Sequence, residues 1–479
     1  MRLIKILLWL GYALLSSAAL MLVTAMLSTI VLELREAVLM AFLALIAALT
    51  GALMITASFK AASKESASEA ILFLVLFWTV VPIVCSLPFY VLGATDSVVT
   101  AAFEGVSAMT TTGASTLDPE SLSRTLLFWR SLLQFFGGMA VATFAVVILA
   151  ALNLTGTGIH RSGLFTFRTG QLFDRIVGIG QLIAAIYLFF AAIGFMLMIM
   201  GGTDTFTALC LALSGVSTGG LQPFNGPLAN VLSPVSAIVL AMLCMVGAFN
   251  ISVVWDFLRL RRWRSFARIF THVEHRGLFA IAAILFLTTL FFASLYNFGP
   301  ALLDAFYFVS SAGYRYDVIS LDMVPAPVLI VTALIGGSAL STAGGIKVIR
   351  LLLLFRHLGT DIARLSHPSR VKPIEFRGQA IADEEFLSIW MYFFGYTFCF
   401  AIGALFLGAG GLQLQDALAV SAASIANIGP LLDMTLPSSG LRYADFTGLQ
   451  LTIAATLMLI GRVEVLIALS LLIPATWRQ

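Results

Sequence analysis

Apolar stretches long enough to cross a lipid bilayer recur along the chain from Ile6 almost to Gln479. A hydrocarbon core of about 30 Å requires about 20 apolar residues per spanning helix. Sixty per cent of the 479 residues are hydrophobic and only 11% are charged, which leaves no soluble domain between these stretches. The sequence therefore predicts an all-α polytopic membrane protein.

The charged residues are distributed unevenly between the loops. Basic residues gather at Lys60 and Lys64 and in the segments 160–175, 259–276 and 347–372. The intervening loops carry acids instead, near Glu33, Asp96, Asp204, Asp304 and Asp416. Short loops rich in Lys and Arg stay cytoplasmic, so ten spans with both termini in the cytoplasm satisfy every loop. Each basic segment lies between spans with no domain to present it, which argues against nucleic acid as a partner.

A polar tetrad that contains glycine interrupts the apolar pattern four times. The four tetrads are Thr110-Thr111-Thr112-Gly113, Val216-Ser217-Thr218-Gly219, Ser310-Ser311-Ala312-Gly313 and Ala426-Asn427-Ile428-Gly429. Their glycines are 106, 94 and 116 residues apart, and each tetrad follows a span, an acidic loop and a short apolar segment. The pattern predicts an N-terminal helix pair (1–66) and four repeats of helix, pore helix and helix, at 67–165, 166–270, 271–372 and 373–479. Non-helical backbone at membrane depth persists only where it is buried in protein or faces water, so we expect one central pore on a pseudo-fourfold axis.

The tetrads have the composition that a filter for an alkali cation requires. Rings of backbone carbonyl oxygens can replace the water shell of the ion, and glycine adopts the positive φ that turns successive carbonyls inward. Hydroxyl groups of Thr and Ser add oxygen ligands or hold the loop. The alternative for any single tetrad is a helix C-cap, where glycine is also preferred. The acids that precede the tetrads, Asp96, Asp204, Asp304 and Asp416, are candidates for pore-helix N-caps or for attracting cations.

Two longer motifs are specific enough to indicate a family. They are Phe128-Trp129-Arg130-Ser131-Leu132-Leu133-Gln134 followed by Gly137-Gly138-Met139, and Gly336-Gly337-Ser338 leading into Ser341-Thr342-Ala343-Gly344-Gly345-Ile346-Lys347. With Ser217-Thr218-Gly219-Gly220 and Asn427-Ile428-Gly429-Pro430, they make the whole chain resemble the TrkH/KtrB family, in the Trk/Ktr/HKT superfamily of potassium transporters. The resemblance implies potassium uptake through a channel-like pore in the bacterial inner membrane, and no enzymatic activity.

The resemblance also implies roles for individual residues. The filter and its potassium sites are then Thr111, Thr112, Gly113, Ser217, Thr218, Gly219, Ser311, Ala312, Gly313, Asn427, Ile428 and Gly429. The segment 336–345 becomes an intramembrane loop below the filter, which interrupts the second helix of the third repeat. The gate is formed by Gly336, Gly337, Ser338, Gly344, Gly345, Lys347 and Arg462. Close helix packing through small residues is the alternative for the loop.

Arg462 lies near the middle of the last apolar stretch. An unpaired charge there costs about 2.5 to 3.5 kcal/mol, so such a residue usually faces a polar interior. By the resemblance, Arg462 projects below the filter and acts with the intramembrane loop as a barrier to ions. The alternative is a structural charge pair, for which Glu464, only two residues away, points to a different helix face.

The outer mouth departs from the family pattern. Arg315 follows the third filter glycine by two residues, so its charge repels cations unless Asp317 neutralises it or the side chain turns outward. Ala312 and Ile428 supply no hydroxyl in the third and fourth filters. We therefore expect weak discrimination between potassium and sodium.

Partners are implied by the resemblance alone. They are a second copy of the chain, forming a homodimer, and a cytosolic nucleotide-binding ring protein of the TrkA/KtrA type. The basic segments 259–276 and 347–377 are the expected docking faces, and contact with anionic membrane lipid is their alternative. No covalently bound cofactor is expected, since potassium is the transported ion and nucleotide acts only through the partner.

Three other functions are weighed against potassium uptake. An ion-coupled secondary solute transporter also contains broken helices but predicts inverted repeats, whereas these segments run in the same direction. A weakly selective sodium- and potassium-permeable paralogue, or a non-conducting one, shares the fold. An enzyme is disfavoured because His272 and His275 lack the spacing of a zinc protease motif.

Overall fold

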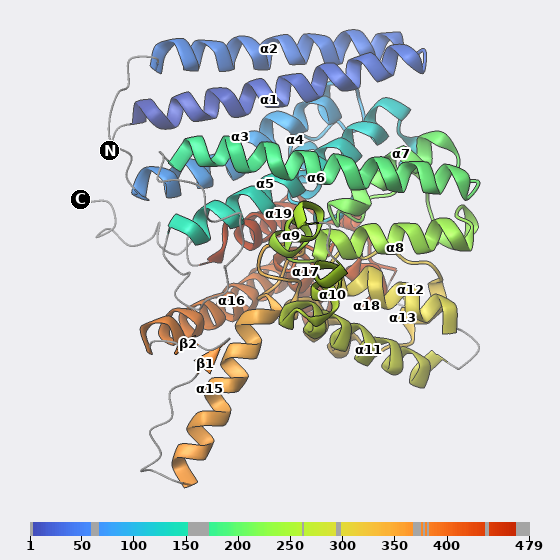
Figure 1. The fold of residues 1–479 in the computed structure, drawn as a ribbon. Coiled ribbons are helices and arrows are strands. Elements are labelled where there is room, and N and C mark those ends of the chain that lie inside the picture. The colour runs from blue at the N-terminus through green and yellow to red at the C-terminus, as the bar shows by residue number, and fades with distance from the viewer. Residues whose placement is uncertain are drawn as a thin grey trace.

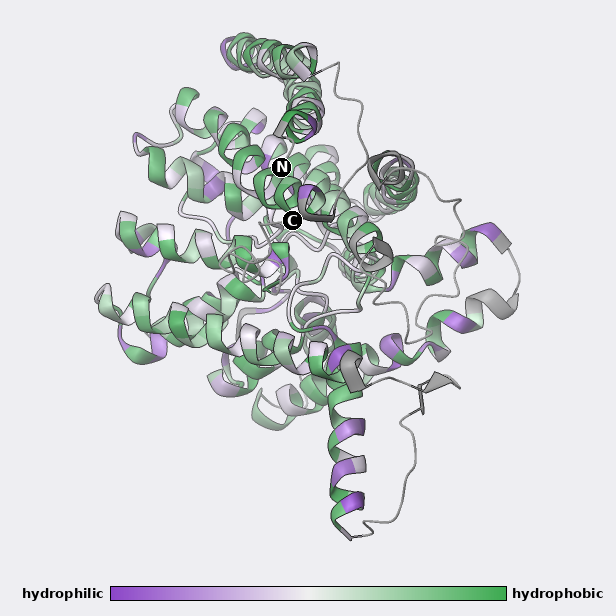
Figure 2. Ribbon diagram, turned by 90° about the vertical axis from the view of Figure 1, so that its left-hand side faces the viewer, coloured by the Kyte–Doolittle hydropathy of each residue, from purple (hydrophilic) through white to green (hydrophobic). Residues whose placement is uncertain are grey.

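The computed structural model describes residues 3–58, 67–151, 172–260, 263–293, 298–366, 375–376, 379–380, 383–435 and 440–465. Helices dominate this part of the chain, and its only strands are β1 (Glu375–Phe376) and β2 (Gln379–Ala380), which pair antiparallel. Seven of the helices are long and apolar enough to cross a membrane. Figure 2 shows apolar residues along nearly all of them. The prediction of an all-α polytopic membrane protein is confirmed, apart from this two-residue ladder.

An N-terminal helix pair flanks the rest of the body. Helix α1 (Leu3–Ile30) packs along α2 (Leu34–Ser58), as Figure 1 shows at one edge of the molecule. The two helices approach closely where two glycines meet, since a Cβ atom at Gly11 would lie 2.8 Å from the Gly51 carbonyl oxygen. The turn between them carries Glu33, whose carboxylate accepts hydrogen bonds from the Thr125 amide at 2.9 Å and from the Thr125 hydroxyl at 2.6 Å. The pair is thereby attached to the start of a helix in the first repeat.

Four groups of helices follow, each with a twelve-residue pore helix at its centre. The first comprises α3 (Ala67–Val91), α4 (Val98–Met109), η1 (Pro119–Ser121) and α5 (Arg124–Ala151). The second comprises α6 (Leu172–Met200), α7 (Thr205–Val216), η4 (Leu228–Asn230), α8 (Pro234–Ala248), α9 (Ile251–Leu260) and α10 (Trp263–Thr271). The third comprises α11 (Val273–Ala293), α12 (Phe298–Val309), α13 (Val318–Asp322), α14 (Ala326–Ile335) and α15 (Val348–Ser366). The fourth comprises α16 (Asp383–Ala409), α17 (Leu414–Ile425), α18 (Leu431–Thr435), η6 (Tyr443–Asp445) and α19 (Gly448–Val463).

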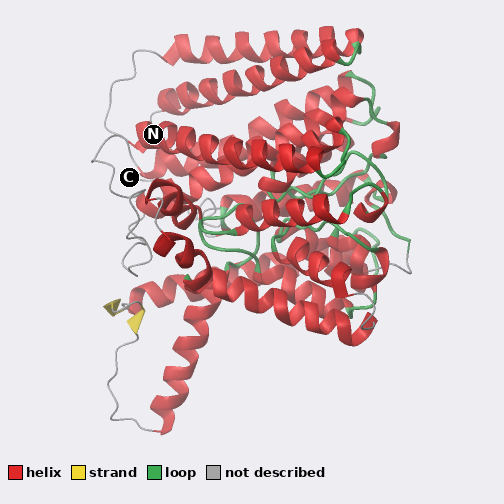
Figure 3. Ribbon diagram, turned by 45° about the vertical axis from the view of Figure 1, so that its right-hand side comes forward, coloured by secondary structure: helices red, strands yellow, loops and turns green. Residues whose placement is uncertain are grey.

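The second helices of the repeats are less regular than ten uninterrupted spans would require. The expected break after α14 is present, but α8 and α9 are also separated by a sharp bend of 105°. The described part of α19 is only 16 residues long. Figure 3 shows loops running into the middle of the helical body. Irregular backbone therefore reaches the interior at more places than the sequence predicted.

The pore helices begin in different ways, so the predicted aspartate caps hold in only one repeat. Asp204 caps α7, because its carboxylate accepts hydrogen bonds from the amides of Phe206 and Thr207. Helix α4 is capped by Ser97, and α17 starts after Gln413, which makes no side-chain cap. Asp304 lies inside α12 and is fully buried, which corrects its expected place at the helix start.

Candidate functional site

Each pore helix ends in the same sharp change of backbone direction. The first residue after the turn has a positive φ in all four repeats: Thr111 (51°), Thr218 (55°), Ser311 (64°) and Asn427 (53°). Non-glycine residues rarely adopt this conformation, so its fourfold recurrence marks structurally equivalent positions. The residue two positions later is a glycine every time: Gly113, Gly220, Gly313 and Gly429.

This alignment of the four repeats moves the filter glycine of the second tetrad by one residue, from Gly219 to Gly220. The amide of Gly219 bonds to the carbonyl of Ser214, five residues back, as Thr112 does in the first repeat. Gly219 therefore corresponds to Thr112, and the equivalent of Gly113 is Gly220. Because two glycines are adjacent here, glycine spacing alone could not choose between them. Backbone conformation and hydrogen bonding distinguish them.

The four loops contact one another in a closed ring. A Cβ atom added to each glycine would meet the loop of the next repeat, at the following distances: Gly113 to the Gly219 carbonyl, 2.4 Å; Gly220 to the Ala312 carbonyl, 2.2 Å; Gly313 to Ile428, 3.1 Å; and Gly429 to the Ala114 amide, 2.2 Å. The amide of Gly429 also donates to the Thr112 carbonyl at 2.6 Å, joining the fourth repeat to the first. The repeats therefore surround one axis, where glycine leaves room for the neighbouring backbone at Gly113, Gly220 and Gly429 and for the Ile428 side chain at Gly313.

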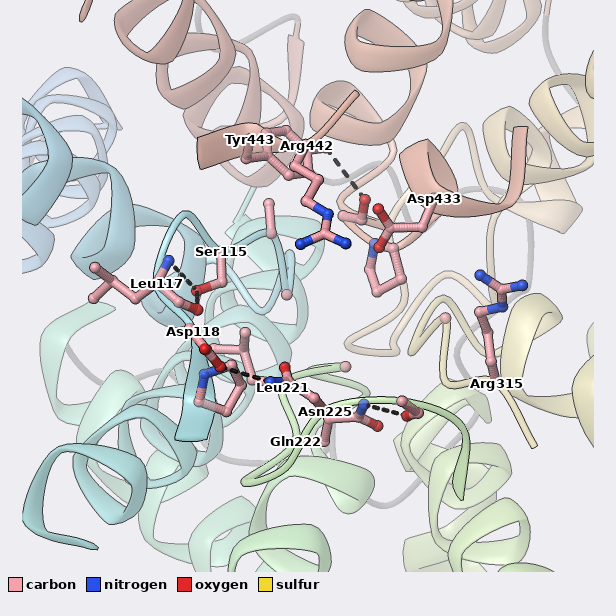
Figure 4. A pocket seen from close by; sticks show the side chains of 18 of the residues that line it. Ser115, Leu117, Asp118, Leu221, Gln222, Asn225, Arg315, Asp433, Arg442 and Tyr443 are labelled. Atoms are coloured by element: carbon pink, nitrogen blue, oxygen red, sulfur yellow. Dashed lines mark hydrogen bonds between the residues drawn. The ribbon is translucent and has the colours of Figure 1, made fainter. Parts of the chain in front are cut away.

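A cavity of about 740 Å³ opens on one side of this ring. All four equivalent glycines line it, together with Arg315, Asp322, Asp433 and Arg442. Figure 4 shows the guanidinium group of Arg442 extending toward the middle of the cavity, while Arg315 lies at its edge. Charges of both signs therefore surround the approach to the ring.

Arg315 forms an ion pair with Asp322 in α13. Asp317, the partner considered from the sequence, donates its backbone amide to the buried Asp304 carboxylate at 3.5 Å. Burial raises the pKa of Asp322, although the Arg315 charge opposes this shift. The charge of Arg315 is thus neutralised by a residue seven positions along the chain.

Hydroxyl groups of the tetrads hold the loops in place. The Thr112 hydroxyl lies 2.7 Å from the Thr110 hydroxyl and accepts a hydrogen bond from the Asn427 amide group at 2.9 Å. The Ser311 hydroxyl accepts from the Gly344 amide at 3.2 Å. These groups connect the loops to each other and to the segment beneath them.

Gln134, from the first long motif, supports the second loop from behind. Its amide nitrogen donates to the Gly219 carbonyl at 2.5 Å, and its oxygen accepts from the Ser214 hydroxyl at 2.5 Å. Ser214 in turn lies 2.5 Å from the Tyr314 hydroxyl. A buried chain of hydrogen bonds therefore joins three repeats. The motif identified Gln134, but nothing in the sequence indicated Ser214 or Tyr314 as its partners.

The segment after α14 forms a hairpin on the opposite side of the ring from the cavity. Gly336 and Gly345 have φ values of 75° and 80°, and a Cβ at Gly336 would lie 1.9 Å from the Gly344 carbonyl. The amide of Lys347 donates to the Ile335 carbonyl at 2.9 Å, which closes the hairpin. The Lys347 ammonium group donates to the carbonyls of Ser341, at 3.2 Å, and Ala343. The segment for which the sequence predicted an intramembrane loop is thus a compact buried turn.

The intramembrane loop is attached to the break between α8 and α9. The Ser338 amide donates to the Ala248 carbonyl at 3.3 Å, and the Ile251 amide donates to the Leu340 carbonyl at 2.9 Å. Thr342 reaches the filter, because its hydroxyl lies 2.9 Å from the Thr218 hydroxyl. The loop thus spans from the second filter loop to the bend in the second repeat.

Arg462 connects the intramembrane loop with the first filter loop. Its guanidinium group donates at 2.5 Å to the carbonyls of Thr110 and Thr342 and to the hydroxyl of Thr111. Arg462 is one residue from the end of α19, and Glu464 has a φ of 67°, so the helix does not continue through this point as expected. Glu464 pairs with Arg350 at 2.8 Å. The partners of Arg462 are therefore neutral oxygens, in a position directly below the ring.

Comparisons with known proteins agree with this architecture. The family model described as TrkH, a cation transport protein, matches residues 35–474. The chain belongs to the TrkH family. It is 29% identical over 420 residues to the Trk system potassium uptake protein TrkH of Escherichia coli strain K12, covering 86% of each chain. The corresponding Salmonella typhimurium protein is 30% identical over 420 residues, again with 86% of each chain covered. The crystal structure of the potassium transporter TrkH from Vibrio parahaemolyticus superposes with a TM-score of 0.89, at 26% identity and over 100% of both chains.

Membership of the TrkH family confirms two predictions from the sequence. The chain is a multi-pass membrane protein, and it belongs to a family of transporters rather than of enzymes.

One buried cluster of this TrkH-family chain was missed by sequence analysis. The carboxylate of Glu274 accepts from the Ala339 amide at 2.7 Å and from the Asn250 side chain at 3.1 Å. The Asn250 amide donates to His275 at 2.9 Å. Glu274 therefore joins the intramembrane loop to the bend between α8 and α9. The signal for it in the sequence is an acid and a histidine at the start of an apolar helix, at the edge of a basic loop.

Proposed function

We propose that this TrkH-family chain takes up potassium through the axis enclosed by its four filter loops. The single observation that carries the proposal is the closed ring of loops, with a charged cavity on one side and Arg462 with the intramembrane loop on the other. Backbone carbonyls held at such an axis are ligands that suit an alkali cation. The Escherichia coli and Salmonella typhimurium relatives are named potassium uptake proteins, which supports the choice of ion.

The proposed ion-binding residues follow the structural register. They are the backbone carbonyls at Thr111, Thr112, Gly113, Thr218, Gly219, Gly220, Ser311, Ala312, Gly313, Asn427, Ile428 and Gly429. Ser217 corresponds to Thr110 and lies one residue below this set. The tetrad hydroxyls mainly support the loops. The absence of a hydroxyl at Ala312 and at Ile428 is therefore expected to affect ion selectivity less than the sequence alone suggests.

The proposed gate consists of Arg462 and the intramembrane loop. Arg462 bonds to both the filter and the loop, so it holds the two in the arrangement that blocks the axis. Lys347 stabilises the loop by donating to two of its carbonyls. Opening then requires that the contact between Arg462 and Thr342 is broken and that the loop moves aside.

The test of the proposal is ion flux through the purified chain in proteoliposomes. An inside-negative membrane potential should drive uptake of potassium, and uptake of sodium should be smaller. Equal uptake of both ions would identify a weakly selective cation pathway. Absence of uptake from a folded chain would reject the proposal and favour a non-conducting paralogue, whereas uptake only with a co-transported solute would indicate a coupled secondary transporter.

External acid is expected to reduce potassium uptake through Arg315. Asp322 has a raised pKa, so it binds a proton at a higher pH than an ordinary aspartate as the external pH falls. Protonation removes the negative charge of Asp322 from beside Arg315, and the net positive charge that repels entering cations increases. Two other acids act on this ion pair: Asp317 on Asp322, and Asp433 on both Arg315 and Asp322. Uptake measured at successively lower external pH should fall in the native chain and fall less in Arg315→Ala. An identical pH profile in both chains contradicts this assignment.

The chain is proposed to form a homodimer through α15. This helix projects from the body in Figures 1 and 2, and Phe355, Leu358, Ile362 and Leu365 are exposed along one face of it. Their spacing of three, four and three residues is that of a helix–helix seam. Leu365→Glu should convert the dimer into a monomer in mass measurements, while Thr360→Glu, on another face of α15, should not. A native chain that is monomeric in lipid nanodiscs contradicts the proposal and leaves lipid as the occupant of this face.

The regulatory partner is proposed to be a cytosolic nucleotide-binding ring protein. The basic residues around α9, α10 and the start of α15 provide a positively charged face for it. A purified ring protein of this class should bind the reconstituted chain in a nucleotide-dependent manner, and charge reversal at Arg259 and Arg268 should weaken binding. Binding of anionic lipid alone, with no complex, would contradict the proposal.

The proposed location is the inner membrane of a bacterium, with both termini in the cytoplasm. Figure 1 shows that α1 begins on the same side of the body as the β1–β2 ladder, whose flanking segments are rich in Lys and Arg. Basic loops stay cytoplasmic. Labelling of single cysteines introduced near each terminus should therefore require permeabilised cells; labelling in intact cells would contradict this orientation.

A further inference from the structure

Two pore helices carry a buried carboxylate at the same place in the repeat. Glu104 in α4 is nine residues before Gly113, and Asp304 in α12 is nine residues before Gly313. Both side chains are completely buried. Burying a carboxylate is costly unless it is hydrogen-bonded or paired, so each of these groups requires partners close by.

Both carboxylates bind the same point of the adjacent filter strand, which is the part of each filter loop that follows its pore helix. The amide three residues after the filter glycine donates to each: Thr116 to Glu104 at 2.6 Å, and Tyr316 to Asp304 at 2.5 Å. A hydroxyl from the same outer segment adds a second bond, from Thr116 to Glu104 at 2.9 Å and from Ser320 to Asp304. The same contact is therefore built twice, with different acids and different hydroxyl donors.

The other two repeats have no carboxylate at this position. The equivalent residues, nine before the filter glycines, are Leu211 before Gly220 and Val420 before Gly429, and both are buried and apolar. Because the repeats follow one another around the axis, the first and third lie diagonally opposite. The two filter strands that are held by a carboxylate, in the first and third repeats, thus form one diagonal pair. The strands of the second and fourth repeats, which have no such carboxylate, form the other.

Arg130 connects the first anchor with an unanchored strand. Its guanidinium group attracts Glu104 and donates to the Ser115 hydroxyl at 3.2 Å, and Ser115 also donates to Glu104 at 3.1 Å. The same group donates to the Gln222 carbonyl, in the second filter strand, at 3.1 Å. Loss of the Glu104 charge should therefore disturb two adjacent strands.

We propose that Glu104 and Asp304 are positioning residues that set the ion selectivity of the filter. Each filter strand runs from the end of its pore helix to the outer loop, and in the first and third repeats the carboxylate fixes the outer end. Selectivity among alkali cations depends on the distance and field of the carbonyl oxygens, so a strand released at one end admits ions of other sizes. The inference rests on the proposed function, because it concerns the same four strands.

The test compares permeability ratios rather than amounts of flux. Reversal potentials between potassium and sodium solutions would be recorded for the reconstituted native chain, Glu104→Gln and Asp304→Asn. The sodium-to-potassium permeability ratio should rise by about three- to tenfold in both variants, the size expected from losing one ordinary hydrogen bond. Glu104→Asp, which keeps the charge on a shorter side chain, should recover part of the native ratio.

Milder variants and a matched control keep the test decisive if a carboxylate variant folds poorly. Thr116→Val and Ser320→Ala each remove one hydroxyl donor to the carboxylates and should shift the ratio in the same direction by a smaller factor. Leu211→Met, a volume-conserving change at the same register, should leave it unchanged.

The outcomes separate this inference from the proposed function. A native chain that conducts and prefers potassium, with unchanged ratios in all the carboxylate and hydroxyl variants, overturns the positioning role alone. An equal shift in Leu211→Met also overturns it, because any disturbance of a pore helix would then have the same effect. A folded native chain without cation flux overturns the proposed function and the inference together.

Discussion

Replacing Gly220 by alanine should abolish potassium flux in a chain that still folds. Gly220 has a φ of 79°, and a Cβ atom there would lie 2.2 Å from the carbonyl oxygen of Ala312 in the third filter strand. Backbone atoms cannot yield as a flexible side chain can, so the alanine methyl group must displace the strand that faces it. The positive φ adds about 1 kcal/mol or more of strain for a residue with a side chain. Potassium uptake in proteoliposomes, with size-exclusion chromatography as the folding check, measures the effect.

Two other glycines provide matched comparisons for this substitution. In Gly359→Ala the added Cβ meets no atom within 4 Å, so flux should equal that of the native chain. In Gly219→Ala the Cβ would lie 2.4 Å from the Gln134 side chain, which should weaken the support of the strand and reduce flux without abolishing it. Native flux in a folded Gly220→Ala chain would contradict the register assigned here, and complete loss in Gly219→Ala with native flux in Gly220→Ala would reverse it.

The fourfold architecture could be predicted because its causes are local in the sequence. Length and hydropathy identify spanning helices, and a polar tetrad after a short apolar segment identifies a re-entrant loop. The intramembrane loop was expected from the family resemblance, and its glycines suit a reversal of the chain, since Gly336 and Gly345 adopt positive φ there. These features depend on a few consecutive residues and not on contacts with distant parts of the chain.

The remaining features depend on contacts between residues far apart in the chain. Gln134 and Gly219 are 85 residues apart, and Arg462 and Thr110 are 352 apart. Asp304 was expected to cap a helix because acids favour helix starts, but its partners follow the filter glycine and become visible only when the strand folds back. The bend between α8 and α9 contains no proline, and its support by Glu274 comes from α11, 24 residues further along the chain.

Replacing Arg462 by alanine should increase potassium flux by about tenfold, which corresponds to lowering a barrier by roughly 1.4 kcal/mol. The guanidinium group has three hydrogen bonds, to Thr110, Thr111 and Thr342, and it lies buried below the filter ring. Removing it takes a positive charge from the ion path and releases the intramembrane loop from the first filter strand. Both changes favour conduction. Initial rates of potassium uptake, at equal protein per liposome, give the ratio.

The charge and the hydrogen bonds of Arg462 can be separated by a second substitution. Arg462→Lys keeps the positive charge but cannot make the same three bonds, so flux should rise less than in Arg462→Ala if repulsion of the ion dominates the barrier. Equal increases in both variants would assign the barrier to the tethered loop instead. Arg364→Ala, on the projecting helix α15, removes an arginine whose partner is Asp361 and should leave flux unchanged. Unchanged flux in a folded Arg462→Ala chain would exclude Arg462 as the gate and leave its three bonds with a purely structural role.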